Sequence, residues 1–505
     1  MLSKQIKGGA ILSYATIFLT NIVGILLTPF IIRSLGASEY GLYTMIGAFI
    51  GYMSVLDLGL NNTIIRFVAK YRAENNKKEE ANFLALCFIM YAIISLIIVV
   101  VGLVLYFNIN GLFGDTMNAE ELRKAKIMAG ILIFNLSITL PGGAFTGICN
   151  GYEEFIAPKT ISIIRYIIRS VLIVAILLMG ANSIGIVIVD TCMNLLFMAS
   201  VAYVVFKKLK VKIRLYKFDK VLLKTILGYS IWIFIFSIVN QLRWQFGQVI
   251  LGLNYETAIV AIYAVGVTLG TYYGAFSGAI SSLFQPKAMK MVVKNEPSVI
   301  VTDTFIKISR ILLLVLLFVF GGFILTGKQF IILWVGSEFT EAYSYTLLIM
   351  IGLTFILSQG FANNILQAHN KMTFRGVTLI VTTLLGFMLG WYYSLIYGAL
   401  GLIVCTVVFM FIERACIWWY LKKSLAINMA HYFSRTLPLF ISFLVAIAVG
   451  YLCIAQIQGS GWYIFSVKVL IYSMIYFTCI YFSLDDFEKE LIKTSFKKLN
   501  TIKSS

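Results

Sequence analysis

Long apolar segments recur along nearly the whole chain, and they constrain its fold more than any other feature. About fourteen stretches of roughly 20 residues or more match the hydrocarbon thickness of a bilayer. We therefore expect an all-α integral membrane protein with about fourteen transmembrane helices. The expected spans are residues 9–32, 40–64, 83–107, 126–148, 160–180, 184–206, 225–251, 256–284, 305–326, 343–366, 375–397, 398–421, 437–457 and 463–484.

The distribution of Lys and Arg supports this count. Basic residues concentrate on alternate connections, such as 66–82, 207–224 and 285–304, and cytoplasmic loops are the ones enriched in Lys and Arg. A missed span would reverse the pattern beyond it, and no reversal occurs. The sequence therefore predicts a multi-pass membrane protein with both termini in the cytoplasm. Its Lys-, Asn- and Ile-rich composition suggests a bacterial source, and so the bacterial cytoplasmic (inner) membrane.

The composition excludes several classes of function. The net charge of +19 would suggest nucleic-acid binding in a soluble protein, but here the cations lie on short loops beside apolar spans. The expected loops are too short to form a domain, and the sequence has no GxxxxGK[ST] motif for nucleotide. The cysteines and histidines show no metal-ligand spacing. We expect no metal, no cofactor and no enzymatic activity.

An internal repeat divides the chain. Gly36 and Gly252 are 252 − 36 = 216 residues apart, and Gly185 and Gly401 are 401 − 185 = 216 residues apart, in similar local sequence. Each repeat holds six spans, so both insert in the same orientation, and transporters built this way bind substrate between their repeats. We expect a six-helix lobe in residues 1–210, a second in 211–424, and two further helices with a cytoplasmic tail in 425–505.

Polar residues on one face of the second span suggest a cavity lining. Gly47, Gly51 and Ser54 precede Asp57 and Asn61 on this face. In the other repeat, the eighth span carries Gly270, Tyr273 and Ser277 at comparable positions. Packing of helices through small residues explains the glycines equally well. A carboxylate within a span favours a polar role for Asp57.

The seventh span carries the densest group of hydrogen-bonding residues. We expect it to line the cavity through Asn240, Gln241, Arg243, Trp244, Gln245 and Gln248. Arg243 could clamp a phosphate through two parallel N–H bonds, or could extend towards the lipid headgroups instead. The first span adds Asn21 as a further cavity candidate, and Pro29 as a hinge because proline interrupts helical hydrogen bonding. Arg66, Arg165 and Arg169 are expected at the cytoplasmic mouth.

Several motifs together resemble those of a known family. They are Gly9-Ala10 with Pro29, then Leu35-Gly36 with Tyr40-Gly41-Leu42-Tyr43, then Asp57-Leu58-Gly59-Leu60 with Arg66 and Ala69-Lys70-Tyr71, and finally Asn150-Gly151-Tyr152. The chain resembles the polysaccharide biosynthesis flippases, which move lipid-linked oligosaccharide repeat units. These belong to the multidrug/oligosaccharidyl-lipid/polysaccharide exporter superfamily.

The resemblance implies a function and partners. It implies that an oligosaccharide linked to undecaprenyl pyrophosphate moves from the inner to the outer leaflet by alternating access, for surface polysaccharide synthesis. It implies membrane lipids and a polysaccharide polymerase as partners. It also implies that the protein is a monomer. Arg243 matches the family's cavity cations by position only. A drug antiporter driven by H⁺ or Na⁺ is the alternative, and a membrane enzyme is less consistent with the short loops.

Overall fold

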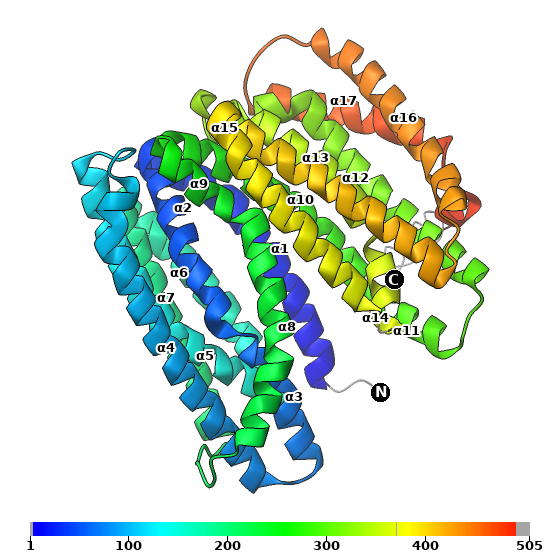
Figure 1. The fold of residues 1–505 in the computed structure, drawn as a ribbon. Helices are drawn as coiled ribbons and strands as arrows, with labels where there is room; N and C mark the ends of the chain where they lie inside the picture. The colour runs from blue at the N-terminus through cyan, green and yellow to red at the C-terminus, as the bar shows by residue number, and fades with distance from the viewer. Residues whose placement is uncertain (1–3, 370, 491–505) are drawn as a thin grey trace, which may run out of the picture. The chain divides into compact units, whose positions relative to one another are not determined.

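The computed structural model describes residues 4–369 and 371–490, and in these ranges the chain forms helices and no strands (Figure 1). The described helices are α1 (Lys4–Leu35), α2 (Ala37–Gly51), η1 (Tyr52–Asp57), α3 (Leu60–Ala73), α4 (Lys77–Phe113), α5 (Ala119–Gly151), α6 (Ile156–Leu178), α7 (Ser183–Tyr203), η2 (Val204–Lys208), α8 (Lys220–Trp244), α9 (Phe246–Asn254), α10 (Thr257–Leu283), α11 (Gln285–Val293), α12 (Ser298–Trp334), η3 (Ser337–Phe339), α13 (Ala342–Ser358), α14 (Gly360–Ala368), α15 (Met372–Leu425), α16 (Met429–Ala455) and α17 (Trp462–Tyr481). The all-α membrane fold is confirmed.

Fewer of the described helices qualify as membrane spans by their length and apolar composition than the fourteen expected. Among the described residues, eleven helices are long and apolar enough to cross a membrane, or twelve if α13 and α14, bent by 42°, form one span. The 54-residue α15 is two helices, because Gly398 has a non-helical backbone with φ 60° and ψ −144°. A Cβ at Gly386 would touch Phe409, so the two halves fold back on each other. The count of fourteen stays a prediction.

Side-chain caps satisfy the free backbone N–H groups at several helix starts. Asn118 accepts hydrogen bonds from Glu120 and Glu121, and Glu121 in turn accepts one from the backbone of Asn118. Asn76 and Asn182 cap α4 and α7 in the simpler way. Such caps stabilise a helix by about 1 kcal/mol, and they fix where the loops end and the spans begin.

The contacts divide the chain into two compact units, residues 1–264 and 265–505, each described here by itself. In the first unit α5 packs against α3, α4 and α7, and α1 packs against α6. Helices α8 and α9, which open the second sequence repeat, pack in this unit against α2, η1 and α3. In the second unit α12 packs against α13, α16 and α17. The three-part division at residues 210 and 424 stays a prediction.

The segment between the repeats is held against the start of α4. The side-chain oxygen of Asn82 accepts hydrogen bonds from the backbone N–H groups of Tyr216 (2.8 Å) and Lys217 (2.9 Å). The backbone N–H of Arg214 donates to the carbonyl of Ala81 at 3.2 Å. Asn82 is buried, so these bonds are shielded from water. The path of the linker is therefore fixed up to Lys217.

A buried arginine joins the end of the described chain to the second unit. Arg310 on α12 donates from Nε and Nη2 to the two carboxylate oxygens of Glu488, at 2.7 and 2.8 Å. It also donates to the backbone carbonyls of Ser483 and Arg435. Arg310 is only 2% exposed. One guanidinium thus ties α12 to α16 and to the segment that follows α17.

Candidate functional site

The second span is broken in its middle. Helix α2 ends at Gly51, η1 carries the chain to Asp57, and α3 begins at Leu60. Between them Leu58 and Gly59 adopt left-handed backbone conformations, with φ of 52° and 69°. A left-handed conformation costs a residue such as leucine about 1–2 kcal/mol. The break also frees N–H groups at the start of α3, and inside a membrane these need a protein partner.

Asp57 supplies that partner. Its carboxylate accepts backbone hydrogen bonds from Gly59 and Asn61, at the start of α3. Tyr91 on α4 donates its hydroxyl to Oδ1 of Asp57 at 2.7 Å. A negative charge at a helix N-terminus is favourable, because the helix dipole is positive there. Asp57 therefore has a polar role within the span, and that role is to complete the break.

Asn61 and Val68 of α3 pack closely against α5. A Cβ at Gly147 would lie 2.5 Å from Oδ1 of Asn61, so only glycine leaves room for that amide. Oδ1 is buried and has no hydrogen-bond partner among the described residues. One turn further along α5, Gly151 leaves room for Val68 in the same way. These small residues hold α3 and α5 close together.

Tyr152 completes this contact at the end of α5. Arg72 donates to the carbonyl of Gly151 at 3.2 Å and lies over the ring of Tyr152. The Tyr152 hydroxyl donates to Glu80 at 2.7 Å, and burial together with this carboxylate raises the pKa of Tyr152. Arg66 is exposed on α3. The Asn150-Gly151-Tyr152 motif thus has a packing role at the end of the bundle.

The polar seventh span meets the break in the second. The hydroxyl of Tyr52 donates to the backbone carbonyl of Gln241 at 3.1 Å, and its ring packs edge-on against Phe246. A Cβ at Gly51 would lie 3.6 Å from the side-chain amide of Gln241. The seventh span is itself broken, since α8 ends at Trp244 and α9 begins at Phe246. Two interrupted helices therefore face each other through polar groups.

The other candidates on the seventh span differ in their exposure. Gln248 is buried, Asn240 is exposed, and Arg243, Trp244 and Gln245 are half-buried. The Asn240 amide donates to the carbonyl of Phe236 on its own helix at 3.0 Å. Of the six expected cavity residues, the structure brings Gln241 directly against the broken second span.

A charged pair joins the middle of α6 to α7 in the first unit. Arg169 on α6 donates from Nε and Nη2 to the two carboxylate oxygens of Asp190 on α7, the second bond measuring 2.9 Å. The two side chains are 23% and 21% exposed. Ionisable groups in a span are costly and normally pair with each other. This pairing neutralises both charges and joins α6 to α7.

Arg165 extends the pair into a polar cluster. It lies one helical turn from Arg169 and donates from Nη1 to the side-chain oxygen of Asn194 at 2.9 Å. The amide of Asn194 lies 3.4 Å from the side-chain oxygen of Asn135 on α5. Nε of Arg165 is buried and has no hydrogen-bond partner among the described residues. We name Arg165, Arg169, Asp190, Asn194 and Asn135 the arginine cluster.

The cluster contains two arginines that were expected at the cytoplasmic mouth. Arg165 and Arg169 both lie inside α6, and their place at a mouth stays a prediction. The helix begins at Ile156, earlier than the span that hydropathy predicts. Lys159, Arg165 and Arg169 lower the local hydropathy, so the predicted span started too late.

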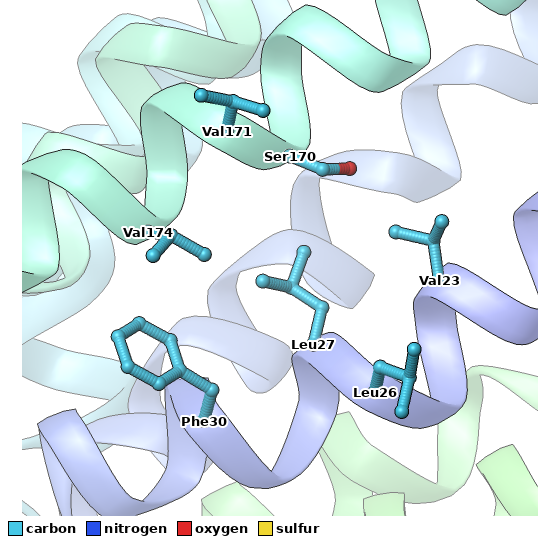
Figure 2. A pocket seen from close by; sticks show the side chains of 7 residues that line it. All are labelled: Val23, Leu26, Leu27, Phe30, Ser170, Val171 and Val174. Atoms are coloured by element: carbon cyan, nitrogen blue, oxygen red, sulfur yellow. The ribbon is translucent and has the colours of Figure 1, made fainter.

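An apolar pocket of about 440 Å³ lies beside the cluster, between α1 and α6. Figure 2 shows Leu26, Leu27 and Phe30 of α1 facing Val171 and Val174 of α6. Val23 and Ser170 complete its lining. Ser170 directly follows Arg169, but Arg169 is directed to Asp190 on α7, so Ser170 is the one polar side chain among the described residues that line the pocket.

The remaining candidates have local partners or lie outside the description. The Asn21 amide donates to the carbonyl of Ile17 at 2.6 Å, within α1, and Pro29 lies inside the same helix. Tyr273 is 2% exposed and bonds Thr354 at 2.7 Å, so it packs inside the second unit. The side chain of Ser277 lies outside the described residues.

Comparisons with known proteins decide the family. A family model described as polysaccharide biosynthesis protein matches residues 6–285, more than half of the chain. The chain belongs to this family. No curated protein matches the chain significantly. The polysaccharide biosynthesis family was the one indicated by the sequence motifs, and that resemblance is confirmed.

Solved structures show how widely the fold of this family member is shared. A lipid II flippase, MurJ, in an inward closed conformation aligns with a TM-score of 0.69 at 17% identity, over 95% of this chain and 99% of that one. An inward-facing MATE family multidrug transporter of the MOP superfamily aligns with a TM-score of 0.63 at 15% identity, over 83% and 98% of the two chains. A MOP superfamily transporter from Pyrococcus furiosus gives 0.54 at 16% identity, over 83% and 94%. The fold is that of MurJ and the MATE transporters.

Sequence reasoning pointed to Arg165 and Arg169 but missed the other three members of the arginine cluster in this family member, which are Asp190, Asn135 and Asn194. One signal was available, because Arg169 and Asp190 carry opposite charges on consecutive spans and a buried charge needs a partner. The register that brings them together depends on the packing of α6 against α7, which periodicity does not give.

Proposed function

We propose that this protein carries an oligosaccharide linked to undecaprenyl pyrophosphate from the inner to the outer leaflet of the bacterial cytoplasmic membrane. Its membership of the polysaccharide biosynthesis family supports the sugar chemistry. Its fold, shared with a lipid II flippase, supports movement of a lipid-linked headgroup. Alternating access between the two sequence repeats is the mechanism that such a duplicated body suggests.

The observation that carries the proposal is the arginine cluster. A sugar pyrophosphate cannot cross hydrocarbon alone, because its hydroxyls and charges would lose their hydrogen bonds to water. Arg165 holds a guanidinium inside a span, with one N–H that has no hydrogen-bond partner among the described residues. Guanidinium groups bind phosphate oxygens through charge-assisted bonds. Asn194 and Asn135 offer further polar groups beside it.

The same cluster argues against a cation-coupled drug antiporter. Such a transporter needs carboxylates free to bind H⁺ or Na⁺. Both oxygens of Asp190 bind Arg169, and Asp57 binds Tyr91 and the start of α3. In residues 4–369 and 371–490, no group of three His, Cys, Asp or Glu side chains could hold a metal ion. Coupling to an ion remains a separate proposal.

Purified protein in liposomes tests the function. The vesicles carry a fluorescent oligosaccharide on undecaprenyl pyrophosphate, and a membrane-impermeant reagent modifies the sugar that reaches the outer face. We expect transfer of this lipid and no export of a cationic dye under an imposed H⁺ or Na⁺ gradient. Dye export without lipid transfer would establish the antiporter instead.

A further inference from the structure

Helices α2 and α10 cross at a contact that leaves no room for a side chain. A Cβ at Gly41 would collide with the backbone carbonyl of Thr257, so the two backbones touch. Close by, Met45 packs against Gly252, another position where a Cβ has no space. Glycine allows this approach because it lacks a Cβ. The starts of α2 and α10 are therefore in direct contact in the first unit.

The residues in contact include an equivalent pair from the two repeats. Helix α2 begins at Ala37 and α10 at Thr257, which are 257 − 37 = 220 residues apart, so Gly41 corresponds to Ala261. A Cβ at Gly41 would lie 3.2 Å from the backbone nitrogen of Ala261. Two equivalent residues of a two-fold repeat can touch only near the axis that relates the repeats. The crossing of α2 and α10 therefore marks the position of that axis at the end of the bundle where both helices begin.

Hydrogen bonds close this crossing. The carboxylate oxygen Oε1 of Glu121 accepts from the hydroxyls of Ser38 (2.5 Å) and Thr257 (2.8 Å). The two hydroxyl oxygens are 2.8 Å apart. We name these three residues the clasp. The hydroxyl of Thr116 adds a bond to the carbonyl of Gly252 at 2.8 Å.

A second set of bonds fixes the first-repeat side of the clasp. Glu39 accepts from Lys124 at 2.8 Å and from the backbone N–H of Ser183 at 2.7 Å. These bonds join α2, α5 and α7, all of which belong to the first repeat. Within the clasp, only Thr257 comes from the second repeat. If the repeats part at this end, the bonds of Thr257 separate, together with the bond from Thr116 to Gly252.

We propose that the clasp is a closed gate at this end of the bundle and that it opens once in every transport cycle. The inference rests on the proposed function, because alternating access requires the repeats to part at each end in turn. The charge pattern of the sequence places this end outside. Small residues and hydroxyls suit such a gate, since the few hydrogen bonds that close it, two of them to the Glu121 carboxylate, can break and re-form without repacking of the helices.

Cysteine cross-linking tests the gate. In a background without the native cysteines, Ser38→Cys and Thr257→Cys bring two sulfurs together, and an added oxidant removes two electrons to form the disulfide. We expect oxidation to stop lipid transfer and reduction to restore it. The control pair is Gly102→Cys with Ile133→Cys, which joins α4 and α5 within the first repeat, where a Cβ at Gly102 would touch the side chain of Ile133. We expect that pair to leave transfer unchanged.

The protein with a complete Ser38→Cys to Thr257→Cys disulfide could transfer lipid as fast as before oxidation. That result would overturn the gate proposal but not the proposed function. A failure of the function itself would appear as no lipid transfer by the unmodified protein. The gate is then judged by a readout that needs no substrate. Thr257 is 3% exposed, so Thr257→Cys reacts with a membrane-impermeant maleimide only while the clasp is open.

Ser38→Ala removes two bonds of the clasp, one of them to a carboxylate. Since a hydrogen bond to a charged group stabilises by about 1.5–3 kcal/mol, we expect labelling of Thr257→Cys to rise roughly tenfold or more. The matched control is Ser34→Ala, which removes an exposed hydroxyl at the end of α1. Equal labelling rates in the two backgrounds would overturn the proposal.

Discussion

Arg169 and Asp190 form a two-bond ion pair between α6 and α7, inside the first unit and within two membrane spans. Removing one partner leaves the other charge without compensation. We expect Asp190→Ala to destabilise the protein by about 3 kcal/mol, the lower end of the range for buried pairs, because each side chain is about one-fifth exposed.

The melting temperature in detergent measures this effect. Arg169→Asp combined with Asp190→Arg restores opposite charges and should recover part of the loss. A single Asp190→Ala variant as stable as the wild type would show that the pair contributes nothing to folding.

Arg165 should act on transport rather than on folding. Because it offers an N–H with no partner among the described residues, Arg165→Gln should slow lipid transfer roughly tenfold or more, the value of a charge-assisted bond to phosphate. Arg165→Lys keeps the charge but loses the planar fork, so we expect partial activity. Arg123→Gln, at an exposed arginine near the start of α5, is the control. Normal transfer by Arg165→Gln would remove the residue from the mechanism.

Two glycines on the expected cavity stripes should respond differently to alanine. A Cβ at Gly270 would lie 2.5 Å from Ile349, whereas a Cβ at Gly51 would meet the Gln241 amide at an ordinary 3.6 Å. Overpacking a core costs about 1–3 kcal/mol, so Gly270→Ala should lower the melting temperature and Gly51→Ala should not. A charge at either position should be severely disruptive. Equal stability of the two alanine variants would contradict the packing described for α10.

Arg310 should hold the last two helices on the second unit. Arg310→Ala leaves Glu488 buried and unpaired, which we expect to cost about 3–5 kcal/mol. Lysine should rescue little, because it cannot donate in four directions from a planar group. Arg435→Ala is the control, since that side chain is 53% exposed, lies 3.9 Å from Asp485, and touches Arg310 only through its backbone carbonyl. Limited proteolysis of α16 and α17 checks the effect, and unchanged cleavage in Arg310→Ala would refute it.

Hydropathy and repeat analysis predicted the helical fold and one sharp boundary. The border expected between residues 397 and 398 coincides with the turn at Gly398, because only glycine accepts that backbone conformation readily. The resemblance of the motifs to the polysaccharide biosynthesis family is also confirmed. Both successes come from signals that are local in the sequence.

The breaks inside spans were not predicted, because apolar content continues across them. Residues 52–59 look like uninterrupted helix in a hydropathy profile, yet Leu58 and Gly59 turn left-handed. Asp57 was expected to have a polar role within the span, but its position just before the start of α3 depends on that turn. The pairing of Arg169 with Asp190 depends on the register of two packed helices. Sequence periodicity contains neither kind of information.

The hydrogen bonds from Asn82 have a practical consequence for labelling the protein. Hydrogen bonds hold the chain joining the repeats up to Lys217, and Asp219 then caps α8 by accepting from the backbone N–H of Leu222 at 3.0 Å, so Phe218 lies between the two anchors. Extra residues placed ahead of Tyr216 would pull the backbone off its anchor, whereas a short tag after Lys217 would loop out into solvent. The two ends of one short connector thus differ sharply in their tolerance of insertion.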